Sequence, residues 1–457
     1  MTTGAPARTG LAATDGWIDR SMAVGWWCVM TLLPIGHLTG LRNTVTTIVV
    51  LATLVRCGRD CWRGLPARWW ALALLGWCAA SIGWSSVPAI SFGKWRVDLL
   101  LPLLAYAAAF GYVRRTGRVD TIVGGTITGM VALAMLSLPA LLPPSVAAAL
   151  AQFVRTDVYA TVSNPMPVWF PGVGDASMAA TLVTVGVLLA ARLVPAMRPG
   201  RVAAAWVVAG LAILLVLVAI NNRNATVTIP IVVLFAAWLD RRRSKSAAAG
   251  GGPRRHRRAF AMGAIAAIAL FGSLALLESG ARQRLQQMGT AVGDGESGLV
   301  VLTGRDTRPM IWAYYHQLAL KHPWIGVGFG RTVPGITYRT QDDGQLARIE
   351  ANAYAHAHNV LLNWWLQTGV VGVVLLLATL VTIVVTAWAR AGPAQSRRRA
   401  ASSTVVALVA ATLLRNMTDD FLIFGMASMF WILVGTFGAA GLRDARTEDS
   451  FSATRAP

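Results

Sequence analysis

Charged residues are scarce in this chain: they make up 13% of its 457 residues, whereas soluble proteins carry about 25%. Acidic residues are scarcer still, at 20 against 41 Lys and Arg, which gives a net charge of +21. Hydrophobic residues reach 55% and gather in runs of about 17–25, the length that crosses a bilayer. Backbone polar groups in lipid must pair within their own segment, so these runs predict transmembrane helices and exclude a soluble enzyme.

The excess of basic charge does not predict a nucleic-acid partner. Most Lys and Arg residues fall in short segments between hydrophobic runs, which is the distribution that orients helices in a membrane. A nucleic-acid-binding protein would instead gather them on one polar surface. The partner that the composition predicts is the lipid bilayer.

Cysteine is also rare, and the four residues of this type predict neither disulfides nor a metal site. Cys28, Cys57, Cys61 and Cys78 all lie outside the predicted external loops, so no disulfide framework is expected. Cys57 and Cys61 have no further Cys or His near them in the sequence to complete a metal site. The first hydrophobic run has no suitable small-residue cleavage site and is expected to remain as a membrane span.

The hydropathy pattern predicts an all-α polytopic membrane protein of about twelve transmembrane helices with one large, partly helical external loop. The predicted spans cover residues 21–40, 43–56, 69–86, 97–112, 120–141, 176–194, 202–220, 227–239, 259–277, 359–388, 400–414 and 421–441. Basic residues concentrate on the side of the termini, so both termini are expected in the cytoplasm. The chain then divides into spans within 1–277, an external loop 278–358, spans within 359–441 and a cytoplasmic tail 442–457. The sequence contains no repeat strong enough to support an inverted-repeat transporter.

A few basic residues lie on the external side, against the orientation rule. Arg223 follows the seventh predicted span between asparagines, and such a cluster suits bidentate binding of an anion such as phosphate. The alternative is an interfacial arginine that reaches toward lipid headgroups. Lys94 and Arg96, on a predicted short external loop from Ser86 to Arg96, allow the same two interpretations.

Two more arginines precede a predicted helix in the large loop. Arg305 and Arg308 come just before Pro309, which fits a first helical turn, and a helix N-terminus attracts anions. The alternatives are a solvated charge for Arg308 and a structural ion pair with Asp306 for Arg305. One face of this helix is predicted to carry Ile311, Trp312, Tyr315, Leu318 and Ala319.

The glycine-rich segment 326–330, Gly-Val-Gly-Phe-Gly, resembles a nucleotide-binding loop only superficially. It has no preceding buried strand and no following helix of a βαβ unit. It is therefore predicted to form a tight turn against the membrane surface.

His356 and His358 close the loop, and His358 directly precedes Asn359 and the next hydrophobic run. An imidazole is the usual base that deprotonates a hydroxyl near neutral pH, so His358 is predicted to be catalytic. The acidic residues of the loop are scattered, so arginines rather than a metal are expected to stabilise a developing negative charge. The alternative for His358 is a capping or packing role at the start of the helix.

These residues together resemble the O-antigen ligase/polymerase superfamily. The resemblance lies in Arg305 followed by Trp312, in the segment 322–330, and in His358-Asn359 before a helix with Gln367, Gly369 and Gly372. It extends to the predicted topology, with one large external loop before the tenth span. Where the family often has Ser-Arg-Gly, this chain has Asn222-Arg223-Asn224.

The resemblance implies an inverting glycosyltransferase that needs no metal or other cofactor. Its donor would be O-antigen on undecaprenyl diphosphate and its acceptor a sugar hydroxyl of lipid A–core, on the periplasmic face of the bacterial inner membrane. The catalytic histidine would be His358, and Arg223 and Arg305 would bind the diphosphate, with Lys94 and Arg96 as further cations. Supporting roles would fall to Asn359, His356 and Arg308. An O-antigen polymerase, a protein O-oligosaccharyltransferase and, in another class, a solute transporter are the alternatives.

Overall fold

The structure is a computed structural model that describes residues 9–35, 39–137, 308–338, 356–390, 397–417, 420, 422 and 424–453. Within these ranges the chain is helical and contains no strand. The predicted spans between 176 and 277, most of the large loop, and Arg223 and Arg305 lie outside the described residues.

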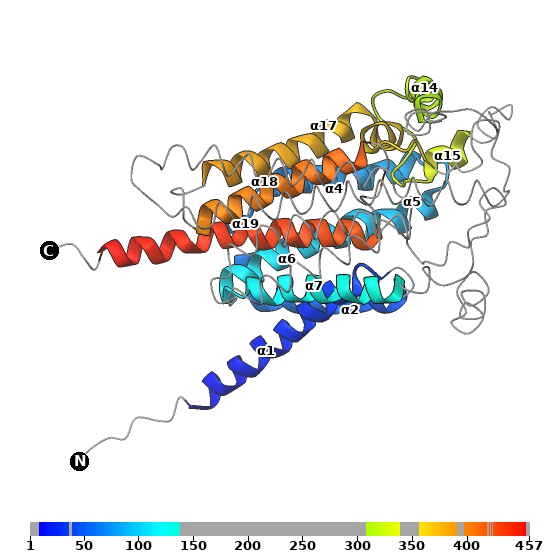
Figure 1. The fold of residues 1–457 in the computed structure, drawn as a ribbon. Helices are drawn as coiled ribbons and strands as arrows, with labels where there is room; N and C mark the ends of the chain where they lie inside the picture. Colours follow the sequence, from blue (N-terminus) through cyan, green and yellow to red (C-terminus); the bar gives the residue numbers. More distant parts are fainter. Residues whose placement is uncertain are drawn as a thin grey trace, which may run out of the picture.

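The helices form a bundle whose long members run beside one another (Figure 1). Their bounds are α1 Thr9–Leu32, α2 Thr39–Cys57, α3 Arg59–Trp62, α4 Arg68–Ala80, η2 Ser81–Trp84, α5 Pro88–Lys94, η3 Trp95–Leu100, α6 Leu101–Thr116, α7 Val119–Ser137, α14 Arg308–Ala319, α15 Val333–Tyr338, α17 Val360–Ala389, α18 Arg397–Asn416 and α19 Phe424–Ala453. The start of α1 and the end of α19 lie at one end of the bundle, whereas α14 and α15 lie at the other. The helices of the predicted large loop, α14 and α15, therefore lie at the end of the bundle opposite to the start of α1 and the end of α19.

Three helical segments in the described part of the chain are long and apolar enough to cross a membrane. They are Pro88–Thr116 with 29 residues, Val360–Ala389 with 30 and Gly425–Leu442 with 18. At 1.5 Å per residue even the shortest approaches the roughly 30 Å thickness of the hydrocarbon core. The total of about twelve spans and the external position of the large loop stay predictions.

Several predicted boundaries are wrong. The first span was predicted at residues 21–40, whereas α1 begins at Thr9 and ends at Leu32. Pro34 accounts for this end, because proline removes a backbone donor and disfavours the helical conformation of the residue before it. The predicted span 400–414 lies within α18, which already begins at Arg397, and the predicted span 421–441 agrees closely with the apolar segment Gly425–Leu442 of α19, a helix that continues to Ala453.

The predicted loop from Ser86 to Arg96 is also wrong. Pro88 begins α5, since a proline in the first turn needs no backbone donor. The chain then passes through the π-helical turn η3 into α6 without a break. Lys94 and Arg96 consequently lie on a helix.

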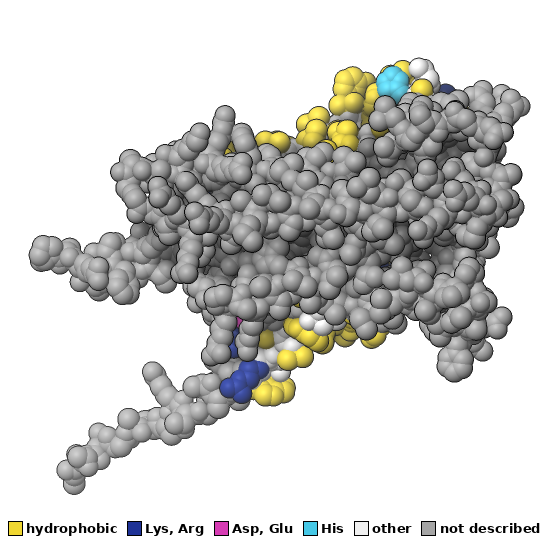
Figure 2. Space-filling view, viewed as in Figure 1, with side chains coloured by type: hydrophobic (Ala, Val, Ile, Leu, Met, Phe, Trp, Pro, Cys, Tyr) yellow, Lys and Arg dark blue, Asp and Glu magenta, His cyan; other side chains and the backbone are white. Residues whose placement is uncertain are grey.

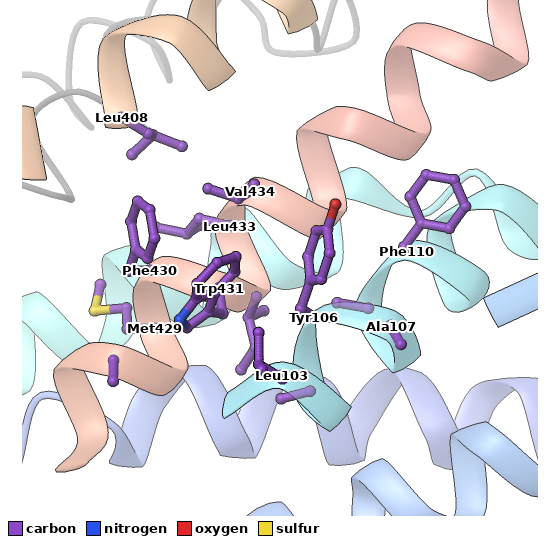
Figure 3. Close-up of a cluster of buried hydrophobic side chains, with 14 of the residues drawn as sticks. Leu103, Tyr106, Ala107, Phe110, Leu408, Met429, Phe430, Trp431, Leu433 and Val434 are labelled. Carbon is purple, nitrogen blue, oxygen red and sulfur yellow. The ribbon is translucent and has the colours of Figure 1, made fainter. Parts of the chain in front are cut away.

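The core of the bundle lies between α6 and α19 (Figure 3). Tyr106 and Trp431 are almost fully buried, and their ring centroids lie 5.4 Å apart. The Tyr106 hydroxyl donates to the Pro66 carbonyl at 2.9 Å, which satisfies the polar end of this buried ring. The contact between the Tyr106 and Trp431 rings holds α6 beside α19.

Candidate functional site

The site is organised around a break in α17. Gly369 has φ 70° and ψ −176°, a backbone conformation that is essentially restricted to glycine. A helix broken here loses the backbone hydrogen bonds that join each amide to the carbonyl four residues earlier. Other groups must satisfy the freed donors and acceptors, because buried backbone polar groups are nearly always paired.

The segment around residues 323–328 supplies these partners. The Leu366 carbonyl accepts from the Val327 amide at 2.9 Å. The Val370 amide, which would bond to Leu366 in an intact helix, donates to the Pro323 carbonyl at 2.8 Å. The Gln367 carbonyl accepts from Gly328 at 2.9 Å. The loop thus replaces one turn of helical hydrogen bonds.

Indole groups complete the same junction. Trp77 Nε1 donates to the Thr368 carbonyl at 2.9 Å, and Trp365 Nε1 donates to the Pro323 carbonyl at 2.9 Å. Trp84 Nε1 reaches the carbonyl of Ile325 at 3.3 Å. These three side chains come from α4, η2 and α17, so the break is held from several directions.

The glycine-rich segment 326–330 is buried between α17 and the end of α4, and the predicted tight turn is wrong. On the α4 side, Phe329 donates its amide to Ser81 Oγ at 3.0 Å. A Cβ on Gly328 would lie 2.5 Å from Cβ of Ser85, so only glycine fits. The segment contacts residues that are distant in the sequence, and the local sequence pattern could not indicate such contacts.

The predicted helix after Pro309 is confirmed as α14, and its apolar face is the expected one. Ile311, Tyr315, Leu318 and Ala319 are buried. Trp312 is half-buried, and its Nε1 donates to the carbonyl of His358 at 3.4 Å. Arg308 is the first residue of α14, the place where an anion would be favoured.

The two histidines contact each other directly before α17. Their ring centroids lie 4.0 Å apart, and the amide of His358 donates to Nδ1 of His356 at 3.1 Å. His356 is 6% exposed and its Nε2 contacts Nη2 of Arg331. His358 is half-buried and has φ 49°, in the left-handed region that residues with a Cβ seldom adopt.

Asn359 caps α17. Its Oδ1 accepts from the Leu362 amide at 3.1 Å, as an N-cap side chain does. Its Nδ2 donates to the Met417 carbonyl at 2.9 Å, which ties the start of α17 to the end of α18. The capping role left open for His358 therefore belongs to its neighbour.

The two predicted cations of the first half of the chain lie in different surroundings. Lys94 is half-buried against the glycine-rich segment, where a Cβ on Gly330 would lie 3.3 Å from Cβ of Lys94. Arg96 is exposed, and its guanidinium lies 5.3 Å from the centroid of the Phe92 ring. The structure thus brings Lys94 next to the residue before Arg331.

Three polar residues near the histidines were not predicted from the sequence to belong to the site. Arg331 directly follows the glycine-rich segment, and that position is the signal that could have found it. Asn363 lies one helical turn after Asn359, is fully buried, and donates from Nδ2 to Oδ2 of Asp420 at 2.6 Å. Asp420 is 2% exposed, so this carboxyl group is held inside the protein.

An open, apolar groove of about 410 Å³ begins at Asn359, the residue after His358. It runs between α14 and α17, from Asn359 past the break to Val373. Its lining consists of Trp312, His316, Asn359, Leu361, Leu362, Trp365, Val370 and Val373. Figure 2 shows exposed hydrophobic side chains and a histidine on the face where Figure 1 places α14 and α17. Such a groove suits a hydrocarbon chain rather than a sugar.

No group of three His, Cys, Asp or Glu residues close enough to hold a metal occurs among the described residues. Arg331 contacts His356, and Lys94 lies beside Gly330, the residue before Arg331. The described part of the site combines a polar end, which holds the two imidazoles and Arg331, with an apolar groove that starts at Asn359.

Comparison with known proteins finds one family model that matches the part of the chain containing this site. Residues 207–377 match the family model of O-antigen ligase, which supports the assignment of the chain to that family and confirms the resemblance. Members of this family are membrane glycosyltransferase-like enzymes that act on polyprenyl-linked glycans. The matched range contains α14, the glycine-rich segment, both histidines and the break in α17, as well as Arg223 and Arg305. No curated protein matches the chain.

Proposed function

Because the match at residues 207–377 supports an assignment to the O-antigen ligase family, we propose that this chain is an O-antigen ligase. It transfers O-antigen from undecaprenyl diphosphate to a sugar hydroxyl of lipid A–core, with inversion and without a metal. The observation that carries the proposal is the position of His358. His358 lies two residues before α17 and next to Asn359, which lines the apolar groove, and its ring contacts that of His356, which in turn contacts Arg331.

The proposed reaction needs one base. His358 takes the proton of the acceptor hydroxyl as that oxygen attacks the anomeric carbon of the donor sugar. The bond from the anomeric carbon to the phosphate oxygen breaks on the opposite face, so the configuration inverts. Undecaprenyl diphosphate leaves with the electron pair and needs positive charge close to its oxygens.

Cationic side chains would stabilise that leaving group. Arg223 and Arg305 are proposed to bind the diphosphate, because guanidinium groups bind phosphate oxygens in a bidentate way. Lys94 supports this assignment, since it lies beside Gly330 in the segment that leads to Arg331. Arg96 and Arg308 are proposed to add to the positive potential of the same region.

The apolar groove supports a lipid-linked donor. A diphosphate at the polar end, near Asn359, would leave its hydrocarbon chain to follow the groove toward Val373. A polar substrate such as a free sugar nucleotide would gain nothing from these apolar walls. The donor and acceptor would meet at the periplasmic surface of the inner membrane, with both termini in the cytoplasm.

The direct test is transfer in vitro with purified protein, undecaprenyl-diphosphate-linked O-antigen and lipid A–core. His358→Ala is expected to lower the rate by about a hundredfold or more, the usual contribution of a general base. His322→Ala, a change of an exposed histidine in the same loop, is the matched control and is expected to keep the wild-type rate. Full activity of His358→Ala would refute the proposal. Loss of activity with a chelator would refute its metal-independent part.

An O-antigen polymerase and a protein O-oligosaccharyltransferase would use the same mechanism and differ from a ligase only in the acceptor. A strain that lacks this protein distinguishes a ligase from a polymerase. Full-length O-antigen that stays on its lipid carrier indicates a ligase, whereas lipopolysaccharide with a single repeat indicates a polymerase. A protein O-oligosaccharyltransferase would transfer the same glycan to a protein acceptor in the purified system. A transporter would show no transfer to any acceptor.

A further inference from the structure

The backbone of His358 is held in an unfavourable conformation from both sides. Its φ of 49° is left-handed, which a residue with a Cβ adopts only where its surroundings impose it. Its amide donates to Nδ1 of His356, and its carbonyl accepts from Nε1 of Trp312. Both backbone polar groups of the proposed base are therefore fixed by side chains of other residues.

His356 is itself occupied at both ring nitrogens. Nδ1 accepts the amide of His358, and Nε2 contacts the guanidinium of Arg331. A neutral imidazole has one nitrogen with a free lone pair and one that carries a hydrogen. Nδ1 uses the lone pair to accept the His358 amide, so Nε2 carries the hydrogen and His356 has no acceptor left to take a proton from a substrate. Of the two histidines, His356 thus suits positioning and His358 suits proton transfer.

The break in α17 positions Arg331 next to His356. The preceding residue, Gly330, donates its amide to Oε1 of Gln367 at 2.8 Å. Gln367 is 3% exposed and lies two residues before Gly369, so its amide group is fixed within the junction. A continuous set of contacts therefore joins the broken helix to His358 through Gly330, Arg331 and His356.

We propose that Arg331 and His356 are positioning residues that hold His358 in the geometry needed for proton transfer. This inference rests on the proposed function. It assigns these two residues no contact with substrate, and it predicts an effect on the chemical step rather than on substrate binding. Side chains that orient a catalytic group typically contribute tenfold to a hundredfold in activity.

Substitutions of His356 can separate its two contacts. In His356→Asn, Oδ1 takes the place of Nδ1 and can still accept the His358 amide. In His356→Gln, the longer side chain can reach Arg331 but offers no acceptor at the Nδ1 position. His356→Ala loses both contacts. His322→Ala serves as the matched control, because His322 is exposed and lies outside this set of contacts.

The measurement is kcat and KM for the lipid-linked donor in purified, detergent-solubilised full-length protein. His356→Ala is expected to lower kcat by about tenfold to a hundredfold, with KM changed less than about twofold. His356→Asn is expected to recover most of the lost kcat, and His356→Gln is expected to recover little. Arg331→Ala is expected to lower kcat by less than His356→Ala, because the bond from the His358 amide to Nδ1 of His356 remains, and Arg331→Lys is expected to recover part of that loss.

Each outcome decides between the proposals. If His356→Ala, His356→Gln and Arg331→Ala keep the wild-type kcat while His358→Ala is inactive, the positioning inference is wrong and the proposed function stands. Equal losses in His356→Asn and His356→Gln, or a loss confined to KM, also overturn it. The Asn and Gln variants are similar in size to histidine, so their comparison decides the matter even if the alanine variant does not fold. Full activity of His358→Ala would instead overturn the proposed function.

Discussion

Gly369 and Trp324 approach so closely that a Cβ on Gly369 would lie 2.0 Å from the Trp324 carbonyl oxygen. Both the space and the backbone angles at this position admit only glycine, since φ is 70° and ψ is −176°. The contact joins the loop that carries the proposed chemistry to a helix long enough to cross the membrane. Its substitution should therefore affect stability and activity together.

Gly369→Ala is expected to destabilise the protein by at least about 2 kcal/mol, because strained backbone and steric overlap add to one another. The measurement is the midpoint of thermal unfolding in one detergent. The matched control is Gly76→Ala, where a Cβ would meet nothing within 4 Å and where the exposed position lies inside α4. This control is expected to be neutral or to stabilise by about 0.5–1 kcal/mol. An equal midpoint for Gly369→Ala and the wild type would contradict the steric argument.

Asn363→Ala is expected to cost about 1.5–3 kcal/mol, the range for a hydrogen bond to a charged group. The reason is that Nδ2 of Asn363 donates to Oδ2 of Asp420 at 2.6 Å, and both residues are buried. Gln317→Ala, on an exposed position of α14, is the control and should change the unfolding midpoint little. A larger loss is expected for Asn363→Asp, which would place two carboxyl groups together. If all three variants unfold at the same temperature, the bond contributes nothing.

Val373→Trp is expected to raise KM for a donor with a full-length polyprenyl chain by about tenfold, which corresponds to about 1.4 kcal/mol of lost binding. The added indole would fill the groove where the chain is proposed to lie. With a donor that carries a short prenyl chain, the effect should disappear. Val374→Trp is the matched control, because Val374 is adjacent, 54% exposed and outside the groove. Equal KM values for the two variants with the long donor would place the chain elsewhere.

Burial raises the pKa of Tyr338 to about 12, from its ordinary value of 10.0. The folded state therefore favours the neutral hydroxyl, which donates to the Leu318 carbonyl at 3.3 Å. Below pH 10 this contribution to stability is complete, and it is lost as the pH rises from about 10 to about 12. The difference in unfolding midpoint between the wild type and Tyr338→Phe is expected to be constant below pH 10 and to turn against the wild type above it. A constant difference up to pH 12 would show that the hydroxyl is not buried in solution.

Local sequence patterns predicted two helices of the site, α14 and α17. The apolar spacing after Pro309 identified α14 and its buried face, and Asn359 followed by a long hydrophobic run identified the start of α17. Composition was sufficient for the fold class, because long apolar segments leave the chain few alternatives in lipid. These features depend on neighbours within a few residues, which is why the sequence contains them.

The remaining features depend on contacts between distant residues. The glycine-rich segment pairs with Gln367 and Ser81, and no property of residues 326–330 alone specifies those partners. The role proposed for Arg331 depends on its contact with His356, which lies 25 residues further along the chain. Polar residues at 86–96 suggested a loop, whereas the proline began a helix there. Sequence reasoning thus located the ends of the site and missed the connection between them.

The break at Gly369 also makes α17 a helix with a single joint. Trp312, Arg331 and the two histidines are all bonded to the part before the joint or to the loop docked on it. The Pro323 carbonyl in that loop accepts both from Trp365 before the joint and from Val370 after it. The two parts of α17 are therefore bonded to the same loop, and the joint sets a fixed change of direction rather than a free hinge. The reactive end of the helix consequently keeps one orientation relative to the hydrophobic part that follows it.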